Sequence, residues 1–170
     1  MPPERVLVVD GYNVIHRVPE LEASLDGGLA NARNRLAVRV SAWAREHPGV
    51  ECVIVFDGDF EHSGGRDERL AGIPCLFSLS AHGGDDEIIR FVRERRGRKA
   101  DVTVVSDDNK VGNNCRAHGA AVRPSSFLME RKTRPASPAP NRRKDPAEGR
   151  GLDRKAAAAI EDELKKKFGL

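Results

Sequence analysis

The sequence predicts an α/β domain with a central, mainly parallel sheet that helices cover on both faces. Short runs of β-branched and aliphatic residues alternate with longer segments whose apolar residues recur at helical spacing. Two of the short runs, residues 6–9 and 50–56, end directly on an Asp-Gly pair, which is typical of a strand that leads into a tight turn. Strands that alternate with helices in this way favour parallel pairing, because each helix carries the chain back to the same end of the sheet.

The predicted elements follow this alternation as far as residue 132. The clearest helix has apolar residues at positions 29, 32, 36, 40 and 43, and His47-Pro48-Gly49 ends it. In chain order the prediction is a strand at 6–9, a loop at 14–28, a helix at 29–46, a strand at 50–56, a polar surface loop at 59–72, a strand at 74–79, a helix at 85–99, a strand at 102–106, a helix at 110–118, a short strand at 120–123 and a closing helix at 125–132.

The chain divides by composition into three parts. Residues 1–130 form the predicted domain. Residues 131–151 contain four prolines, few apolar side chains and the triplet Arg142-Arg143-Lys144, and we interpret them as a flexible basic linker. Residues 152–170 carry an apolar residue every four positions, which predicts an amphipathic C-terminal helix that packs on the domain or on a partner.

The composition predicts a cytoplasmic protein without a membrane segment. Hydrophobic residues make up 39% of the chain and charged residues 32%, no apolar run approaches the length of a spanning helix, and no signal peptide precedes the first strand. Cys52, Cys75 and Cys115 have no Cys-x-x-Cys spacing and are predicted to be packed, reduced thiols. The net charge of +3 combines a mildly acidic domain with a basic tail, which suits either phosphate binding or a solvated linker.

Acidic residues gather where the predicted strands end. Asp10, Asp57 and Asp107 each follow a strand, and Asp85 or Asp86 begins the helix after another. Parallel strands bring their carboxyl ends to one edge of the sheet, so these carboxylates are expected to meet there and to repel one another. A divalent cation relieves that repulsion, and oxygen ligands without His or Cys select Mg²⁺ or Mn²⁺ over zinc. Such an ion can activate water and stabilise the reacting oxygens of a phosphodiester.

Each of these acids also has an ordinary structural explanation. Asp-Gly after a strand is a common turn, and Asp85 is suited to cap the N-terminus of a helix. Four acids at the same end of their strands are harder to explain as turns, and the pattern therefore favours a metal site.

Four segments occur together in a familiar order. They are Val8-Val9-Asp10-Gly11-Tyr12-Asn13-Val14-Ile15, Val55-Phe56-Asp57-Gly58, Asp85-Asp86-Glu87-Ile88-Ile89 and Val105-Ser106-Asp107. With these segments the chain resembles the YacP-like branch of the NYN domains, which are relatives of the PIN and FEN nucleases. The resemblance covers roughly residues 5–130 and implies a three-layer PIN-like α/β sandwich and a metal-dependent endoribonuclease. Some members of the family act on RNA associated with the ribosome.

The resemblance also implies roles for individual acids. By position, Asp10, Asp86 and Asp107 would be the catalytic carboxylates and would bind Mg²⁺ or Mn²⁺, and Asp57 would complete the metal site. The family often has a small residue where this chain has Asp85, so Asp86 matches the motif better.

Five further residues are candidates for holding the substrate. The resemblance implies that Asn13 orients a ligand or the scissile phosphate, and Ser106 or Asn109 could do the same. Arg66 and Arg69 lie in the polar loop and, with the basic tail, are candidates to bind the RNA backbone. The resulting hypothesis is a Mg²⁺- or Mn²⁺-dependent RNA endonuclease.

Three other classes of function compete with this hypothesis. A non-catalytic RNA-binding adaptor would keep the fold and lose turnover, but the complete set of acids favours the enzyme. A phosphatase of the haloacid dehalogenase type needs a second Asp two residues after the first, where this chain has Tyr12. A phosphoacceptor receiver domain needs an acidic pair ahead of Asp10 and a Lys after the fifth strand, and the sequence has neither.

Overall fold

The computed structural model describes residues 2–58, 67–78 and 83–130. The predictions for residues 131–151 and 152–170 lie outside this range, as does Arg66. The described elements are β1 (Arg5–Asp10), α1 (Gly11–Arg17), α2 (Pro19–Glu22), η1 (Ala23–Gly27), α3 (Leu29–Glu46), β2 (Val50–Phe56), β3 (Asp67–Leu70), β4 (Ile73–Phe77), α4 (Gly83–Gly97), β5 (Asp101–Val105), α5 (Asn109–Ala117), β6 (Ala121–Arg123) and η3 (Ser125–Met129), where η marks a 3₁₀ helix.

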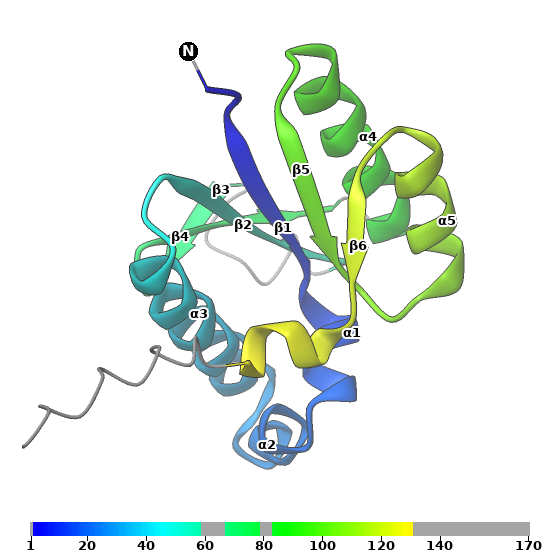
Figure 1. The fold of residues 1–170 in the computed structure, drawn as a ribbon. Helices are drawn as coiled ribbons and strands as arrows, with labels where there is room; N and C mark the ends of the chain where they lie inside the picture. The colour runs from blue at the N-terminus through cyan, green and yellow to red at the C-terminus, as the bar shows by residue number, and fades with distance from the viewer. Residues whose placement is uncertain (1, 59–66, 79–82, 131–170) are drawn as a thin grey trace, which may run out of the picture. The chain divides into compact units, whose positions relative to one another are not determined.

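The strands form one six-stranded sheet in the order β3-β4-β2-β1-β5-β6 (Figure 1). Every neighbouring pair is parallel except β3 and β4, which form an antiparallel hairpin at one edge. The strand that opens the described chain, β1, therefore lies inside the sheet between β2 and β5. The predicted α/β class with a mainly parallel sheet is confirmed.

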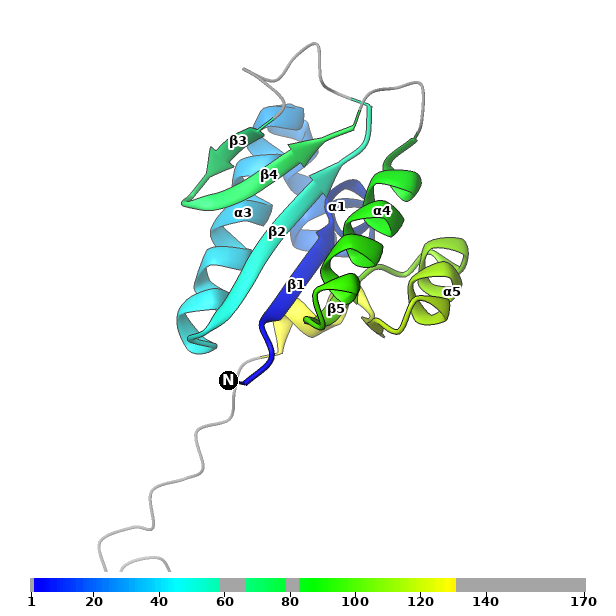
Figure 2. The same ribbon diagram turned by 90° about the horizontal axis from the view of Figure 1, so that it is seen from above.

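Alternation along the strands divides the core into two layers. In β1, Leu7 and Val9 pack with α1, α2 and α3, whereas Val6 and Val8 pack with α4 and α5. The two layers explain why the sequence of β1 is a continuous apolar run, since both of its faces are covered. In Figure 2, β1 and β2 lie between α3 and α4. The structure is a three-layer α/β sandwich.

Two segments predicted to be loops contain regular structure. Residues 14–28, expected as a loop, include most of α1 and all of α2 and η1. Their buried residues Val14, Ile15, Val18 and Leu21 have helical spacing, but Pro19 and the β-branched side chains weaken the helical signal. Residues 59–72 include the strand β3, whose charged sequence Asp-Glu-Arg-Leu suits a sheet edge that pairs on one side only.

The structure also bears on the predictions for the cysteines, the closing helix and a membrane segment. Cys52, Cys75 and Cys115 are free thiols and all are buried, as predicted. The closing helix near residue 125 is the short 3₁₀ turn η3 rather than an α-helix. Among the helices in the described ranges, none combines the length and the apolar character needed to cross a membrane.

Candidate active site

Asp10 ends β1 at the centre of the sheet's carboxyl edge. Because side chains alternate along a strand, Asp10 is directed to the same face as Val6 and Val8, which is the face that α4 and α5 cover. Asp10 is therefore placed toward the start of both helices. The neighbouring strand β5 ends at Val105, which pairs with Val9, so Ser106 comes level with Asp10.

The carboxylate of Asp10 is held by Ser106. The Ser106 hydroxyl donates a hydrogen bond of 2.8 Å to Oδ2 of Asp10, and Ser106 Oγ accepts a bond of 3.1 Å from the backbone N–H of Asp108. Ser106 is only 4% exposed, and its own backbone N–H bonds to the carbonyl of Arg123 at the end of β6. A buried hydroxyl between two strand ends thus fixes the position of Asp10.

The surroundings of Asp10 disfavour its charged form. Burial raises the pKa of Asp10 from its ordinary value of 3.8 to about 6, against the lowering effect of the Ser106 hydrogen bond. The negative charges of Asp85 and Asp108 contribute to the increase in this pKa, and a backbone hydrogen bond with Asn13 opposes it. A carboxylate that is both desolvated and close to other acids is typical of a functional site and favours a bound cation.

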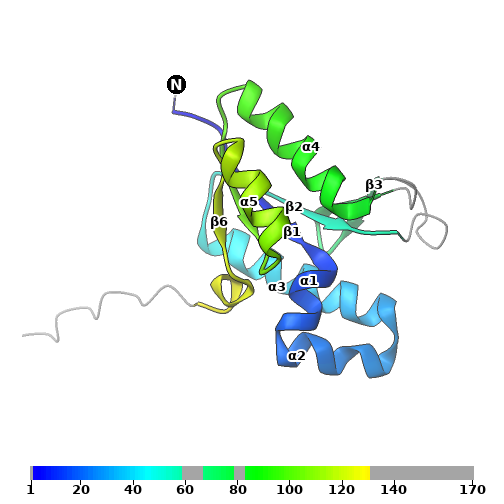
Figure 3. The same cartoon turned by 90° about the vertical axis from the view of Figure 1, so that its right-hand side faces the viewer.

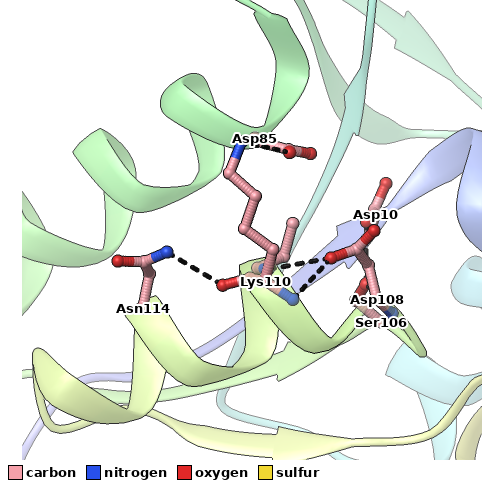
Figure 4. Close-up of polar contacts among 7 residues, drawn as sticks. Asp10, Asp85, Ser106, Asp108, Lys110 and Asn114 are labelled. Carbon is pink, nitrogen blue, oxygen red and sulfur yellow. Dashed lines mark hydrogen bonds and ion pairs between the residues drawn. The ribbon is translucent and has the colours of Figure 1, made fainter.

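Asp85 at the start of α4 acts on Asp10 through its charge. The negative charge of Asp85 raises the pKa of Asp10, and the neighbouring Asp86 is exposed. Figure 4 shows the Lys110 side chain extending from α5 toward Asp85, with Lys110 Nζ 3.5 Å from Asp85 Oδ2. Both partners of this ion pair are open to solvent, so the pair contributes little free energy and leaves Asp85 available.

Asp57 and Asp107 are each hydrogen-bonded to a serine. Asp57 is exposed after β2 and accepts a 3.0 Å hydrogen bond from the Ser78 hydroxyl. Asp107 Oδ2 accepts hydrogen bonds from both the hydroxyl and the backbone N–H of Ser125, the latter at 3.1 Å. Successive side chains at the end of a strand point to opposite faces of the sheet. Because the Ser106 side chain points toward Asp10, the Asp107 side chain points to the other face, where η3 packs.

The predicted substrate residues are divided between two places. Asn13 is at the site, since its Oδ1 accepts a 2.8 Å hydrogen bond from the backbone N–H of Asp107. Asn109 begins α5 and lines a pocket together with Ser106. Arg69 lies on the edge strand β3, pairs in register with Pro74 at the start of β4, and donates to the carbonyl of Gly72. It is therefore separated from Asp10 by two strands.

The turn between β1 and α1 requires glycine. A Cβ atom at Gly11 would lie 2.4 Å from the Phe56 ring and 2.9 Å from the Val55 carbonyl oxygen. The next residue, Tyr12, packs its ring 5.1 Å from that of Phe56 and accepts a hydrogen bond from Arg33. α1 therefore packs closely against β2, and this contact fixes the backbone of the segment that contains Asp10 and Asn13.

A divalent cation fits the chemistry of this site, although the ligands are not preassembled. Over the described part of the chain, no group of three or more His, Cys, Asp or Glu side chains is arranged to hold a metal ion. Magnesium needs fewer protein ligands than that, because it keeps several waters and is commonly bound by one or two carboxylates together with substrate phosphates. Asp10 and Asp85 supply such a pair, and their mutual repulsion would be relieved by the ion.

Four residues that shape the site have no role in the sequence-based prediction. Asp108 caps α5 by accepting from the backbone N–H groups of Lys110 and Val111, and its charge also acts on Asp10. A capping signal is present in the sequence, because an Asp stands three positions before the apolar Val111. Lys110, Ser78 and Ser125 have no local signal, because each reaches the acids through tertiary contacts.

Comparison with known proteins supports the fold and extends the match along the chain. The sequence profile of the YacP-like NYN domain matches residues 7–168. A crystal structure of a mutant of Rae1 (YacP) from Bacillus subtilis superimposes with a TM-score of 0.62 at 20% identity, over 74% of this chain and 72% of that chain. A second crystal structure of Rae1 (YacP) from Bacillus subtilis gives 0.59 at 16% identity, over 95% of this chain and 78% of that chain. A search of curated proteins found no match.

Proposed function

The chain belongs to the YacP-like NYN domain family, and from this premise we propose that it is a metal-dependent endoribonuclease that hydrolyses phosphodiester bonds of RNA. The family has a nuclease-type, RNA-related fold, which the three-layer sandwich shares. The observation that carries the proposal is the position of Asp10, a half-buried carboxylate at the centre of the carboxyl edge with Asp85 and Asp108 close enough to perturb it. In open α/β sheets this edge is where ligands bind.

Asp10 and Asp85 are the residues proposed to hold a Mg²⁺ or Mn²⁺ ion. When bound, such an ion activates water and stabilises the charge that develops on a phosphodiester. We propose Asp85 in preference to Asp86 because the charge of Asp85 acts on Asp10. Asp57 and Asp107, each with one carboxylate oxygen bonded to a serine, are proposed to support the site from outside this pair.

The remaining residues of the site orient the reacting groups. Ser106 holds Oδ2 of Asp10 in place through its hydrogen bond. Asn13 ties α1 to the turn after β5 through the backbone of Asp107, so the two sides of the site stay together. Lys110 forms an ion pair with Asp85 and is placed to contact a phosphate oxygen of the substrate.

The test compares the wild-type chain with Asp10→Asn, Asp85→Asn and Asp86→Asn on a mixed RNA pool and on ribosome-bound messenger, in Mn²⁺, Mg²⁺ or EDTA. Cleavage by the wild type should require the cation and should fall to background in Asp10→Asn and Asp85→Asn. Asp86→Asn is the matched control, because it makes the same change one residue away at an exposed position. It should retain most of the activity.

A second measurement tests the cation without relying on cleavage. Adding Mn²⁺ should raise the thermal unfolding temperature of the wild type and of Asp86→Asn, since a ligand that binds only the folded state stabilises it. The same addition should leave Asp10→Asn and Asp85→Asn unchanged. Cleavage that survives EDTA would contradict the metal-dependent mechanism, and RNA binding without any cleavage by the wild type would favour the adaptor hypothesis.

A further inference from the structure

An open polar pocket of about 210 Å³ adjoins the site between α5 and the end of β6. Figure 3 shows α5 beside β6, and these two elements pack against each other. The polar side chains that line the pocket come from the turn after β5, from α5 and from β6, and they are Ser106, Asp107, Asp108, Asn109, Arg116 and Arg123.

The pocket shares two residues with the site around Asp10. Ser106 lines the pocket and also donates its hydroxyl to Asp10. Asp108 likewise lines the pocket, and its charge acts on the pKa of Asp10. The pocket is therefore close enough to Asp10 for a polymer with one phosphate at Asp10 to place a neighbouring phosphate in it.

The two acids of the lining are already hydrogen-bonded. Asp107 uses Oδ2 to accept from the backbone and hydroxyl of Ser125. Asp108 uses Oδ1 to accept from two backbone N–H groups in the first turn of α5, at 2.7 and 3.0 Å. One oxygen of each carboxylate is in this way already held by donors of the protein.

The two arginines of the lining are not neutralised in the same way. Arg116 makes a 3.3 Å hydrogen bond to the neutral side chain of Asn113, and the Arg123 guanidinium lies 5.8 Å from the centre of the Phe127 ring. Among the ion pairs found between described residues, none includes Arg116 or Arg123. Both guanidinium groups keep donors for an anion, and their planar fork suits phosphate oxygens.

We propose that this pocket is a phosphate subsite for the RNA strand, in which Arg116 and Arg123 bind the backbone next to the bond that is cut. This inference rests on the proposed function, because it takes RNA as the substrate. The inference adds a second point at which the protein binds the RNA strand, and it assigns this contact to two arginines outside the acidic motifs. An anchor on one side of the scissile bond fixes the register of the strand at Asp10.

The test measures binding of a short fluorescent single-stranded RNA to the full chain in EDTA, where the cation cannot contribute. Arg116→Gln and Arg123→Gln should each weaken binding about three- to tenfold, and the double variant more. Each should also make the dependence of binding on salt less steep, by about 0.7 for every phosphate that the variant no longer neutralises. The matched control is Arg98→Gln, because Arg98 is exposed and precedes the opposite end of β5. It should change binding less than twofold.

Two further variants separate phosphate binding from a structural role. Arg123→Lys keeps the charge and the stem but loses the fork, and it should bind RNA with an affinity between those of the wild type and Arg123→Gln. Replacing single RNA phosphates by neutral methylphosphonates should weaken wild-type binding at one or two positions beside the cleavage point. The double arginine variant should be insensitive to replacement at those positions.

The outcomes for the subsite and for the nuclease can be told apart. If the double variant binds like Arg98→Gln while the wild type cuts RNA, the subsite is wrong and the nuclease proposal stands. If binding depends on both arginines but the wild type cuts nothing, the subsite stands and the nuclease proposal is wrong. Absence of RNA binding by the wild type would overturn the subsite as well.

Discussion

The Ser106 hydroxyl donates a 2.8 Å hydrogen bond to Oδ2 of Asp10 and so joins the ends of two neighbouring strands. This bond stabilises the charged form of the carboxylate and lowers its pKa, against the effect of burial. Ser106 is therefore a positioning residue that also sets the pH range in which Asp10 is ionised.

Ser106→Ala should shift the acidic limb of the cleavage profile to higher pH. Without the hydrogen bond the pKa of Asp10 rises, so the Asp10 carboxyl group is ionised in a smaller fraction of the molecules at pH 6. Cleavage at pH 6 should therefore fall about three- to tenfold. At pH 8 the decrease should be small. Ser78→Ala removes the corresponding hydroxyl from Asp57 and serves as the control. An unchanged profile in Ser106→Ala would show that Asp10 does not govern this limb.

Asp10 should make the protein less stable at neutral pH than at acidic pH when EDTA is present. Its pKa is about 6 in the folded state against an ordinary value of 3.8, so the folded state binds more protons between these values and the free energy of unfolding falls as pH rises through them. The contribution reaches at most about 3 kcal/mol. Urea unfolding of Asp10→Asn should match the wild type near pH 4 and exceed it by up to that amount at pH 7.5. A variant less stable than the wild type at both pH values would contradict this expectation.

Gly11→Ala should destabilise the fold and impair the site. Its Cβ would overlap the Phe56 ring and the Val55 carbonyl, and overpacking of this kind typically costs about 1–3 kcal/mol. Urea unfolding measures the decrease in stability. Gly97→Ala is the control, because an added Cβ there meets nothing within 4 Å and alanine favours the helix, so stability should be unchanged or slightly higher.

The three cysteines should resist thiol reagents in the folded protein. Burial raises the pKa of Cys52, Cys75 and Cys115 from 9.0 to about 11, which leaves roughly a hundredfold less thiolate at pH 8. Reaction with an aromatic disulfide should be at least about a hundredfold slower than in the chain unfolded by guanidinium. Stoichiometric labelling of the native protein within minutes would show that at least one thiol is reached by solvent.

The strands of the core could be predicted because their sequences report burial on both faces. β1 and β2 carry largely apolar runs, which a covered parallel strand requires. β3 could not be recognised in the same way, because an edge strand with the sequence Asp-Glu-Arg-Leu resembles a surface loop. α1 could not be recognised for a different reason. Its first residue is the glycine that the turn after β1 needs, and glycine indicates a turn rather than a helix.

The carboxyl edge could be predicted, but the partners of Asp10 could not. Asp10 ends a strand, and its position follows from that alone. The sequence alone does not distinguish Asp85 from Asp86, because both lie in the first turn of α4. Asp107 and Asp108 are neighbours in the sequence, and neighbouring side chains point in different directions. The presence of an acid after β5 therefore does not reveal which of the two acts on Asp10.

The bond between Asp10 and Ser106 spans 96 positions of the chain, and this separation bears on how the protein is made. During synthesis β1 leaves the ribosome before either of its sheet neighbours, since β2 begins only at residue 50 and β5 at residue 101. The nascent chain therefore carries Asp10 without its serine partner until β5 has been translated. If the chain is the nuclease proposed above, it would become able to cut RNA only after β5, whose end holds Asp10, has been translated.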